Sequence, residues 1–360
     1  MEPGMAAILQ QFKERIADAV RSKTPLRLRG GGSKDWYGQA PSGEVLDTRA
    51  YCGVIAYEPS ELVVTVRCGT PLAELEQVLA RKNQMLAFEP PYFGPDATVG
   101  GMLACALSGP RRQSAGAVRD FVLGAVLLDG KGEVLHFGGQ VMKNVAGYDV
   151  SRLLAGSLGT LGLILEVSLK VLPIPMAETS LRFAFSQVEA LARLNAWGGQ
   201  PLPISANAWE DGALTLRLSG VAAAVKAARQ QLGGEAVEQA GAFWAALREQ
   251  DAGFFVPDAD AEAGLWRLAL PTIAPPLALA GRQLIEWGGG QRWLHSTADA
   301  AGIRAVAAQY GGHATLFRGG DKGAGVFQPL APALATIHRR LKNAFDPAGI
   351  FNPGRMYQEF

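Results

Sequence analysis

The sequence predicts an α+β protein built from two units. Its 360 residues exceed the usual size of one domain, and 48% of them are hydrophobic, which is enough for a sizeable core. Segments with the spacing of strands alternate with segments of helical spacing, and the pattern changes after Pro173 and Pro175. A turn-rich segment closes the chain. We therefore expect units at 1–175 and 176–320, with residues 321–360 returning to the first unit.

The first unit is expected to open with an amphipathic helix, because Leu9, Phe12 and Ile16 recur at helical spacing. Thr70 followed by Pro71 is typical of a helix start, with Thr70 as the N-cap. Strands are predicted at 26–28, 54–57, 62–67, 122–128, 134–137 and 163–171.

The second unit contains two sets of strands and helices, which predict one antiparallel sheet covered by helices. Strands are expected at 181–185, 265–270 and 313–317, with hairpins at 206–219 and 283–294. Helices are expected at 188–197, 221–232 and 297–310. A last helix, at 332–345, leads into the closing segment.

Composition excludes several classes of protein. A net charge of +1 gives no electrostatic footprint for nucleic acid or anionic lipid. The four histidines lie far apart and the three cysteines form no CxxC pair, so no metal site is expected. Cys52, Cys68 and Cys105 are expected to be reduced, buried thiols. No apolar run approaches the roughly 18 residues that span a bilayer, so a cytoplasmic location is expected.

The stretch from Pro90 to Gly109, PPYFGPDATVGGMLACALSG, combines small residues with hydroxyl groups. Glycine frees the backbone, and amide N–H groups then turn towards an anion. Two interpretations stay open from spacing alone: an anion site made of backbone amides, or a small-residue helix packed tightly on a sheet.

A second glycine cluster, RGGGSK at 29–34, follows a short strand. It fits neither GxGxxG nor GxxxxGK[ST], so a Rossmann or P-loop site is disfavoured. An anion-binding turn is one interpretation of the cluster, and a flexible linker is the other.

Taken together, several motifs resemble the FAD-binding domain of PCMH-type flavoproteins, the vanillyl-alcohol oxidase superfamily. The motifs are RGGGS at 29–33, PDATVGGMLA at 95–104, SGPRR at 108–112, AGAVRD at 115–120, GSLGTLGLI at 156–164 and DPAGIFNPGR at 346–355. They cover roughly half of the chain in the same order. The resemblance implies a PCMH-type FAD-binding domain joined to an α+β cap domain.

Three stretches are similar to a narrower family, the smaller FAD-binding subunits of bacterial glycolate oxidase, also called glycolate dehydrogenase. They are KNVAGYDVSRLLAGSLGTLG at 143–162, HATLFRGGD at 313–321 and AFDPAGIFNPGRMY at 344–357. This resemblance implies a complex with a larger FAD-linked subunit and an iron–sulfur subunit, which oxidises glycolate to glyoxylate. Any membrane association would then come through the partner subunits.

The resemblance also implies roles for particular residues. Backbone amides of Gly30 to Ser33 and of Thr98 to Gly101 would hold the pyrophosphate of FAD. The full set of residues implied for FAD is Gly30, Gly31, Gly32, Ser33, Asp96, Thr98, Val99, Gly100, Gly101, Ala104, Ser108, Gly109, Arg112, Gly116, Val118, Gly159, Gly162, Ile164 and Asn352.

Two departures from the family pattern shape the expected mechanism. No histidine stands beside the glycine loop, where relatives attach FAD covalently, so we expect non-covalent FAD. The paired metal-binding histidines of hydroxy-acid-oxidising relatives are also absent, and the remaining catalytic candidates are His313 and Arg318. We therefore expect the partner to perform the chemistry while this chain relays electrons. A stand-alone 2-hydroxy-acid dehydrogenase and a non-catalytic scaffold are the alternatives.

Overall fold

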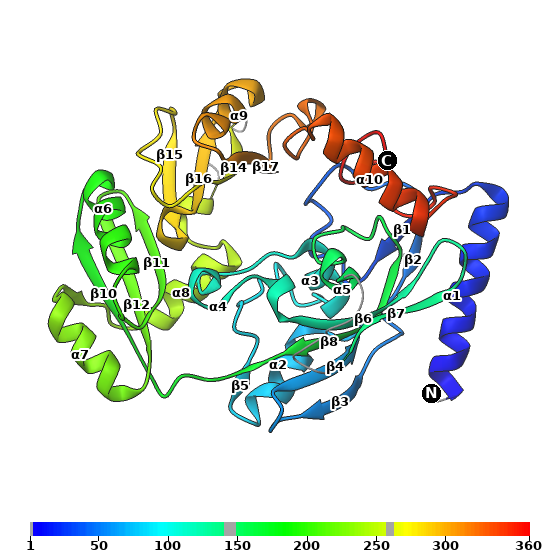
Figure 1. The fold of residues 1–360 in the computed structure, drawn as a ribbon, viewed down its shortest axis with the longest axis horizontal. Helices are drawn as coiled ribbons and strands as arrows, with labels where there is room; N and C mark the ends of the chain where they lie inside the picture. The colour runs from blue at the N-terminus through cyan, green and yellow to red at the C-terminus, as the bar shows by residue number, and fades with distance from the viewer. Residues whose placement is uncertain (1–2, 140–148, 257–262) are drawn as a thin grey trace.

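The computed structural model describes residues 3–139, 149–256 and 263–360. Two bodies lie side by side in Figure 1: the N-terminal part, in blue to cyan, and a second part that carries β10 to β17. We call these the FAD-type domain and the cap. The C-terminal helix, in red, returns to the N-terminal part.

The FAD-type domain is organised around a five-stranded antiparallel sheet of order β3-β4-β8-β6-β7. Its strands are β3 (Val54–Glu58), β4 (Val63–Arg67), β6 (Val122–Leu128), β7 (Val134–Gly138) and β8 (Leu163–Lys170). A parallel pair, β1 (Leu26–Arg29) and β2 (Glu44–Asp47), and a short pair, β5 (Gln84–Met85) and β9 (Leu172–Pro173), lie beside it.

Helices cover both faces of this sheet. One face packs on α2 (Leu72–Ala80) and α3 (Val99–Cys105), and the other packs on α1 (Pro3–Ser22). Alternate strand residues enter the two cores: Val64 and Val66 join the first, whereas Leu163 and Leu165 join the second. Three short elements follow α3: α4 (Arg112–Ala115), η1 (Val118–Phe121) and α5 (Val150–Leu153).

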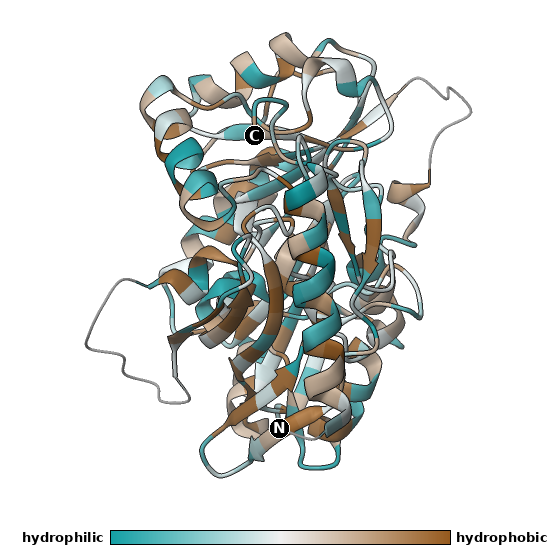
Figure 2. Cartoon of the chain, turned by 90° about the vertical axis from the view of Figure 1, so that its right-hand side faces the viewer, coloured by the Kyte–Doolittle hydropathy of each residue, from teal (hydrophilic) through white to brown (hydrophobic). Residues whose placement is uncertain are grey.

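The cap is an eight-stranded antiparallel sheet of order β13-β10-β12-β11-β15-β16-β14-β17. Its strands are β10 (Ala177–Ala184), β11 (Ile204–Glu210), β12 (Ala213–Gly220), β13 (Glu235–Ala236), β14 (Gly264–Ala269), β15 (Arg282–Glu286), β16 (Gln291–Ser296) and β17 (His313–Arg318). Its helical elements are α6 (Gln187–Gly198), α7 (Ala222–Leu232), α8 (Ala240–Glu249), η2 (Gly253–Phe255), η3 (Trp287–Gly289) and α9 (Ala300–Gln309). After β17 come η4 (Lys322–Ala324) and α10 (Pro332–Phe345). Figure 2 shows hydrophobic residues concentrated on the strands, whereas the outer helices carry many hydrophilic ones.

An ion network ties the cap to the FAD-type domain. Arg217 of β12 contacts the Glu89 carboxylate at 2.8 Å, and Arg111 contacts both Glu89 at 3.3 Å and Glu178 at 3.0 Å. Arg111 and Arg217 are buried, so removing any partner would leave a charge without its counter-ion in a dry interface.

Most elements agree with the sequence predictions, with two instructive differences. Thr70 is not the N-cap of α2: Pro71 takes that position, and the Thr70 hydroxyl accepts from Gly53 N at 2.8 Å and donates to Arg67 O at 2.6 Å. Helix α8 was not predicted. Lys143 to Tyr148, part of a motif used for the resemblance, lie outside the described residues.

Candidate functional site

The glycine loop at 30–32 and the start of α3 lie against each other. A Cβ on Gly31 would sit 1.5 Å from Asp96 O, and one on Gly30 would sit 2.2 Å from the Thr98 hydroxyl oxygen. Side chains are therefore excluded here by close backbone approach. The two glycine-rich stretches of the sequence therefore lie together. Gly30 and Gly31 pack closely against residues 96–98, which a flexible linker would not do.

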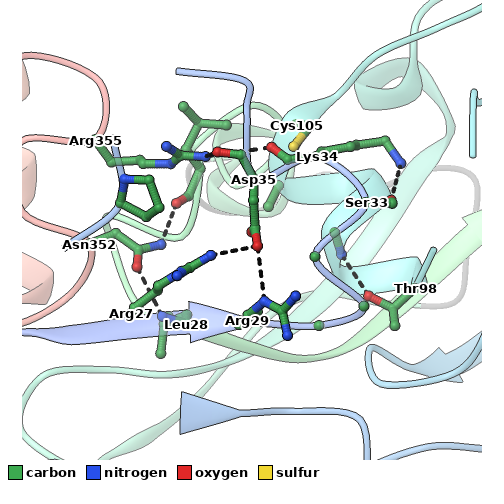
Figure 3. A pocket seen from close by; sticks show the side chains of 17 residues that line it. Arg27, Leu28, Arg29, Ser33, Lys34, Asp35, Thr98, Cys105, Asn352 and Arg355 are labelled. Atoms are coloured by element: carbon green, nitrogen blue, oxygen red, sulfur yellow. Dashed lines mark hydrogen bonds and ion pairs between the residues drawn. The ribbon is translucent and has the colours of Figure 1, made fainter. Parts of the chain in front are cut away.

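A cleft opens at this junction (Figure 3). Two cavities, of about 90 and 70 Å³, share Arg29, Gly30, Gly101, Ala104 and Asn352 in their walls. The cleft is thus lined by β1, the glycine loop, α3 and the C-terminal segment.

The backbone of the glycine loop presents unpaired donors. Within the described residues, the N–H groups of Gly31, Gly32 and Ser33 donate no hydrogen bond. Because buried or half-buried backbone donors are nearly always paired in a folded protein, these three are open to an anionic ligand.

The backbone amides at the start of α3 are not free to bind a pyrophosphate, as the resemblance implies they would be. Its amides already have partners in the protein: Val99 N donates to Thr70 O at 2.9 Å and Gly100 N to Cys68 O at 2.7 Å. Gly101 N donates to the Thr98 hydroxyl at 3.2 Å. The small-residue helix interpretation therefore describes α3 itself, and the free amides belong to the glycine loop.

Cationic side chains outnumber carboxylates in the wall of the larger cavity. They are Arg27, Arg29, Lys34 and Arg355, with Asp35 as the only carboxylate among the described wall residues. The Asp35 carboxylate accepts from Arg27 at 2.5 Å and from Arg29 at 2.9 Å (Figure 3). Burial lowers the pKa of Lys34 and of Arg355. Because four cations face one carboxylate in this wall, the cleft has a net positive charge that suits a diphosphate.

The C-terminal segment fixes β1 and the loop after it. The Asn352 amide accepts from Leu28 N at 2.9 Å and donates to Leu158 O at 2.6 Å. Arg355 donates to Asp35 O at 2.8 Å and to Gln39 O. Asn352 thus acts on the site by holding the strand that leads into the glycine loop.

The other residues implied for FAD divide into three groups. Gly159, Gly162 and Ile164 line the smaller cavity of the cleft, together with Gly100. Ser108 and Gly109 line a separate small cavity that faces the cap sheet. The walls of these cavities do not include Asp96, Val99, Arg112, Gly116 and Val118.

Those five residues have other contacts in this structure. Asp96 presents its carbonyl to Gly31, and Val99 and Val118 are fully buried in the core of the FAD-type domain. The Arg112 guanidinium lies 4.4 Å from the ring centroid of Trp287 in the cap. Gly116 has φ = 108°, which favours glycine.

The two catalytic candidates are held apart. His313 begins β17 at an exposed position and pairs with Ala269, whereas Arg318 ends the strand opposite Leu265. The Arg318 guanidinium stacks over Trp36, 4.3 Å from its ring centroid. Among the residues that the structure describes, no group of three or more His, Cys, Asp or Glu side chains is arranged to hold a metal ion.

Sequence reasoning missed the charged wall of the cleft. Arg27 and Arg29 are separated by one residue on β1, and Arg355 lies three residues after Asn352. The alternation of arginines on a strand that leads into a glycine loop was the available signal, because alternate strand residues share a face.

These features fit FAD, whose diphosphate needs donors and positive charge. The open amides of Gly31 to Ser33 provide the donors, and the cations of the wall provide the positive charge. Cys105 also lines the cleft, and burial raises the pKa of its thiol to about 11, so the thiol stays protonated near neutral pH. A protonated thiol is a poor nucleophile, which favours non-covalent binding.

Comparison with known proteins gives a consistent picture. Residues 7–138 match a family model described as an FAD binding domain, and residues 319–356 match the C-terminal domain of FAD linked oxidases. The expected cofactor, FAD, is confirmed at this level. A solved structure of alkyldihydroxyacetonephosphate synthase aligns with a TM-score of 0.64 at 17% identity, covering 95% of this chain and 74% of that one. This likeness confirms the PCMH-type fold.

Two curated relatives carry the name of one enzyme. The chain is 50% identical to glycolate oxidase subunit GlcE of Escherichia coli strain K12, over 97% of each chain. It is 30% identical to glycolate oxidase subunit GlcD of Bacillus subtilis strain 168, over 48% of this chain and 37% of that protein.

A D-lactate dehydrogenase of Archaeoglobus fulgidus is 33% identical over 48% of this chain and 38% of its own length. No helix among the described residues has the length and apolar character needed to cross a membrane. The full-length match confirms the narrower resemblance: the chain belongs to the family of glycolate oxidase subunit GlcE, within the FAD-linked oxidases.

Proposed function

We propose that this chain is the FAD-binding subunit of a multi-subunit glycolate oxidase that oxidises glycolate to glyoxylate. The observation that carries the proposal is the cationic cleft with open amides at Gly31 to Ser33, in a chain 50% identical to a GlcE subunit over 97% of its length. Its partners would be a larger FAD-linked subunit and an iron–sulfur subunit. Any membrane attachment of the cytoplasmic complex would come through them.

In this proposal the chain holds FAD without a covalent bond. Arg27, Arg29 and Lys34 would neutralise the diphosphate, and the loop amides would orient it. Asn352 holds β1 in place through Leu28 N. The bound flavin supplies the capacity to take up and release electrons.

We further propose that the chain relays electrons between the flavin of its partner and the iron–sulfur subunit. The separation of His313 and Arg318 at opposite ends of β17 supports this division of labour, because hydroxy-acid oxidation requires its acid–base groups to lie together. A stand-alone 2-hydroxy-acid dehydrogenase is the second candidate, favoured by a half-buried Arg267 and a buried Glu286 in the wall of one cavity.

The test is the absorption spectrum of the purified chain, before and after anaerobic addition of glycolate. We expect an oxidised flavin band that stays unchanged until the larger subunit is added and then bleaches. Bleaching by glycolate alone would contradict the relay and favour the stand-alone dehydrogenase. A chain that retains no flavin even after FAD is added would contradict both and leave a scaffold.

A further inference from the structure

Among its described residues, the wall of the cleft at the glycine loop contains one carboxylate, that of Asp35 (Figure 3). Its Oδ2 accepts from Arg27 Nη2 at 2.5 Å and from Arg29 Nε at 2.9 Å. No other carboxylate of the described chain pairs with either arginine. A diphosphate needs both guanidiniums, whereas a carboxylate in the same wall repels it.

The main chain of Asp35 is fixed on two sides. Its N–H donates to Gly32 O at 3.1 Å, and its carbonyl accepts from Arg355 Nη2 at 2.8 Å. The side chains of Asp35 and Arg29 are each 35% exposed and that of Arg27 is 25% exposed, so a ligand that enters the cleft reaches all three groups. The carboxylate therefore has a set position that is open to a ligand.

The guanidinium of Arg29 lies across the glycine loop. A Cβ on Gly32 would sit 2.1 Å from Arg29 Nη2, so the guanidinium packs directly on the backbone there. The open amides of Gly31 to Ser33 belong to the same stretch of backbone. The arginine that Asp35 holds therefore borders the donors that the loop offers to an anion.

Asp35 binds the two arginines through one oxygen only. Both hydrogen bonds end on Oδ2, and Oδ1 accepts none among the described residues. Neither arginine thus makes the two parallel bonds of a bidentate pair, which is the stronger arrangement. A diphosphate carries more negative charge and more acceptor oxygens than a carboxylate, so it is the better partner for these two guanidiniums.

We propose that Asp35 is an internal competitor of the FAD diphosphate: its carboxylate pairs with Arg27 and Arg29 when the cofactor is released and yields both arginines when the cofactor binds. The carboxylate limits the affinity for FAD, because it stays in the wall and repels the diphosphate. It also stabilises the flavin-free chain, since it is the counter-ion of two guanidiniums on alternate residues of β1. The inference rests on FAD binding at this cleft, as in the proposed function.

The carboxylate has two opposite effects on FAD binding. By holding the guanidiniums in place it lowers the loss of side-chain freedom that accompanies binding. By its charge it repels the diphosphate across those same guanidiniums. A partly exposed ion pair orders its side chains only weakly, so the repulsion is the larger effect.

The test is titration of the flavin-free chain with FAD, followed by flavin fluorescence, at a series of salt concentrations. Asp35→Asn, which keeps the shape and removes the charge, is expected to bind FAD roughly fivefold to tenfold more tightly at low salt. The gain should shrink as salt is added, because the repulsion is screened. Inorganic pyrophosphate, used as a competitor of FAD, should gain affinity for the variant by a similar factor.

Thermal unfolding of the same proteins separates this role from a purely structural one. Without FAD, Asp35→Asn should unfold at a lower temperature than the unaltered chain. Saturating FAD should raise the unfolding temperature of the variant more than that of the unaltered chain. Asp18→Asn removes an exposed carboxylate that pairs with Arg21 on α1; it is the matched control and should leave the affinity for FAD unchanged.

Weaker FAD binding by Asp35→Asn would overturn the inference and make the carboxylate a positioning group for the two arginines. Equal binding would overturn it as well. If Asp35→Asn alone fails to fold, Arg27→Gln is compared with Arg27→Gln combined with Asp35→Asn, and the combined variant should bind FAD more tightly.

An unaltered chain that binds no FAD would instead contradict the proposed function. Titration with inorganic pyrophosphate then still decides whether Asp35 limits the binding of a diphosphate.

Discussion

The Glu286 carboxyl is buried in the cap sheet, and no cation pairs with it among the described residues. Burial raises its pKa from 4.5 to about 7, against the opposing effect of the hydrogen bonds from Trp293 and Gln291. The negative charge of Glu89 is a smaller contribution to the same increase. In the unfolded chain the same group ionises near its ordinary pKa, so the folded protein binds an extra proton between the two values.

This difference predicts the pH dependence of stability. The contribution of Glu286 is most favourable below pH 4.5, falls as the pH rises from 4.5 to about 7, and stays constant above that. Glu286→Gln should remove this loss. The free energy of unfolding of the variant should therefore rise relative to that of the unaltered chain from pH 4.5 upwards, and the difference should reach roughly 3 kcal/mol near pH 7. Urea unfolding of both proteins at a series of pH values measures it, and parallel curves would contradict the assignment.

At the scale of single residues, the sequence was informative at positions where close packing of the backbone requires glycine. The resemblance implied a site role for Gly30 and Gly31, and the structure adds that no side chain fits at either position. Arg267 and Glu286 were not identified, since an isolated charge on a strand has no pattern. Their meeting depends on the pairing of β14, β15 and β16.

At the scale of elements, α10 fastens the C-terminal segment to the FAD-type domain. Lys342 Nζ donates to Asp346 Oδ2, Thr160 O and Phe351 O, each at 2.7 Å. The Asp346 carboxylate also accepts from Ile350 N and Phe351 N, at 3.1 and 2.8 Å. This buried cluster sets the path of the segment that ends at the cleft.

We predict that Lys342→Met destabilises the protein by about 3 kcal/mol, because the buried Asp346 loses its counter-ion. FAD retention should fall as well, since the segment that carries Asn352 loses an anchor. Arg340→Met, at an exposed position of the same helix, should change stability by less than about 0.5 kcal/mol. Thermal unfolding with and without added FAD measures both effects, and equal behaviour of the two variants would contradict the role of Lys342.

Element prediction succeeded where the hydrophobic period was clear, as for α1, β8 and the hairpin of β11 and β12. It failed for α8, whose sequence AGAFWAALRE has a short apolar face that packs on the cap sheet through Trp244 and Leu247. It also misplaced Thr70, because its hydroxyl bonds to Gly53 and Arg67 from outside the helix. Both outcomes depend on tertiary contacts that local patterns do not contain.

At the scale of the whole molecule, the cleft is assembled from segments far apart in the sequence. The glycine loop, α3 and the Asn352 segment meet because β1 pairs in parallel with β2 and bonds to residues 350–352. Resemblance to a family anticipated this assembly from the order of the motifs. Physical pattern alone predicted the return of the C-terminal segment to the first unit, but it left both glycine stretches with two interpretations.

FAD binding at the glycine loop is the central claim, and its most direct measurement is titration of the flavin-free chain with FAD. We predict that the unaltered chain binds FAD, that the flavin is released on denaturation, and that Gly31→Ala abolishes binding, because its Cβ would sit 1.5 Å from Asp96 O. Gly241→Ala, where a Cβ meets open space, is the matched control and should bind FAD normally. A Gly31→Ala chain that binds FAD as tightly as the unaltered chain would contradict the account.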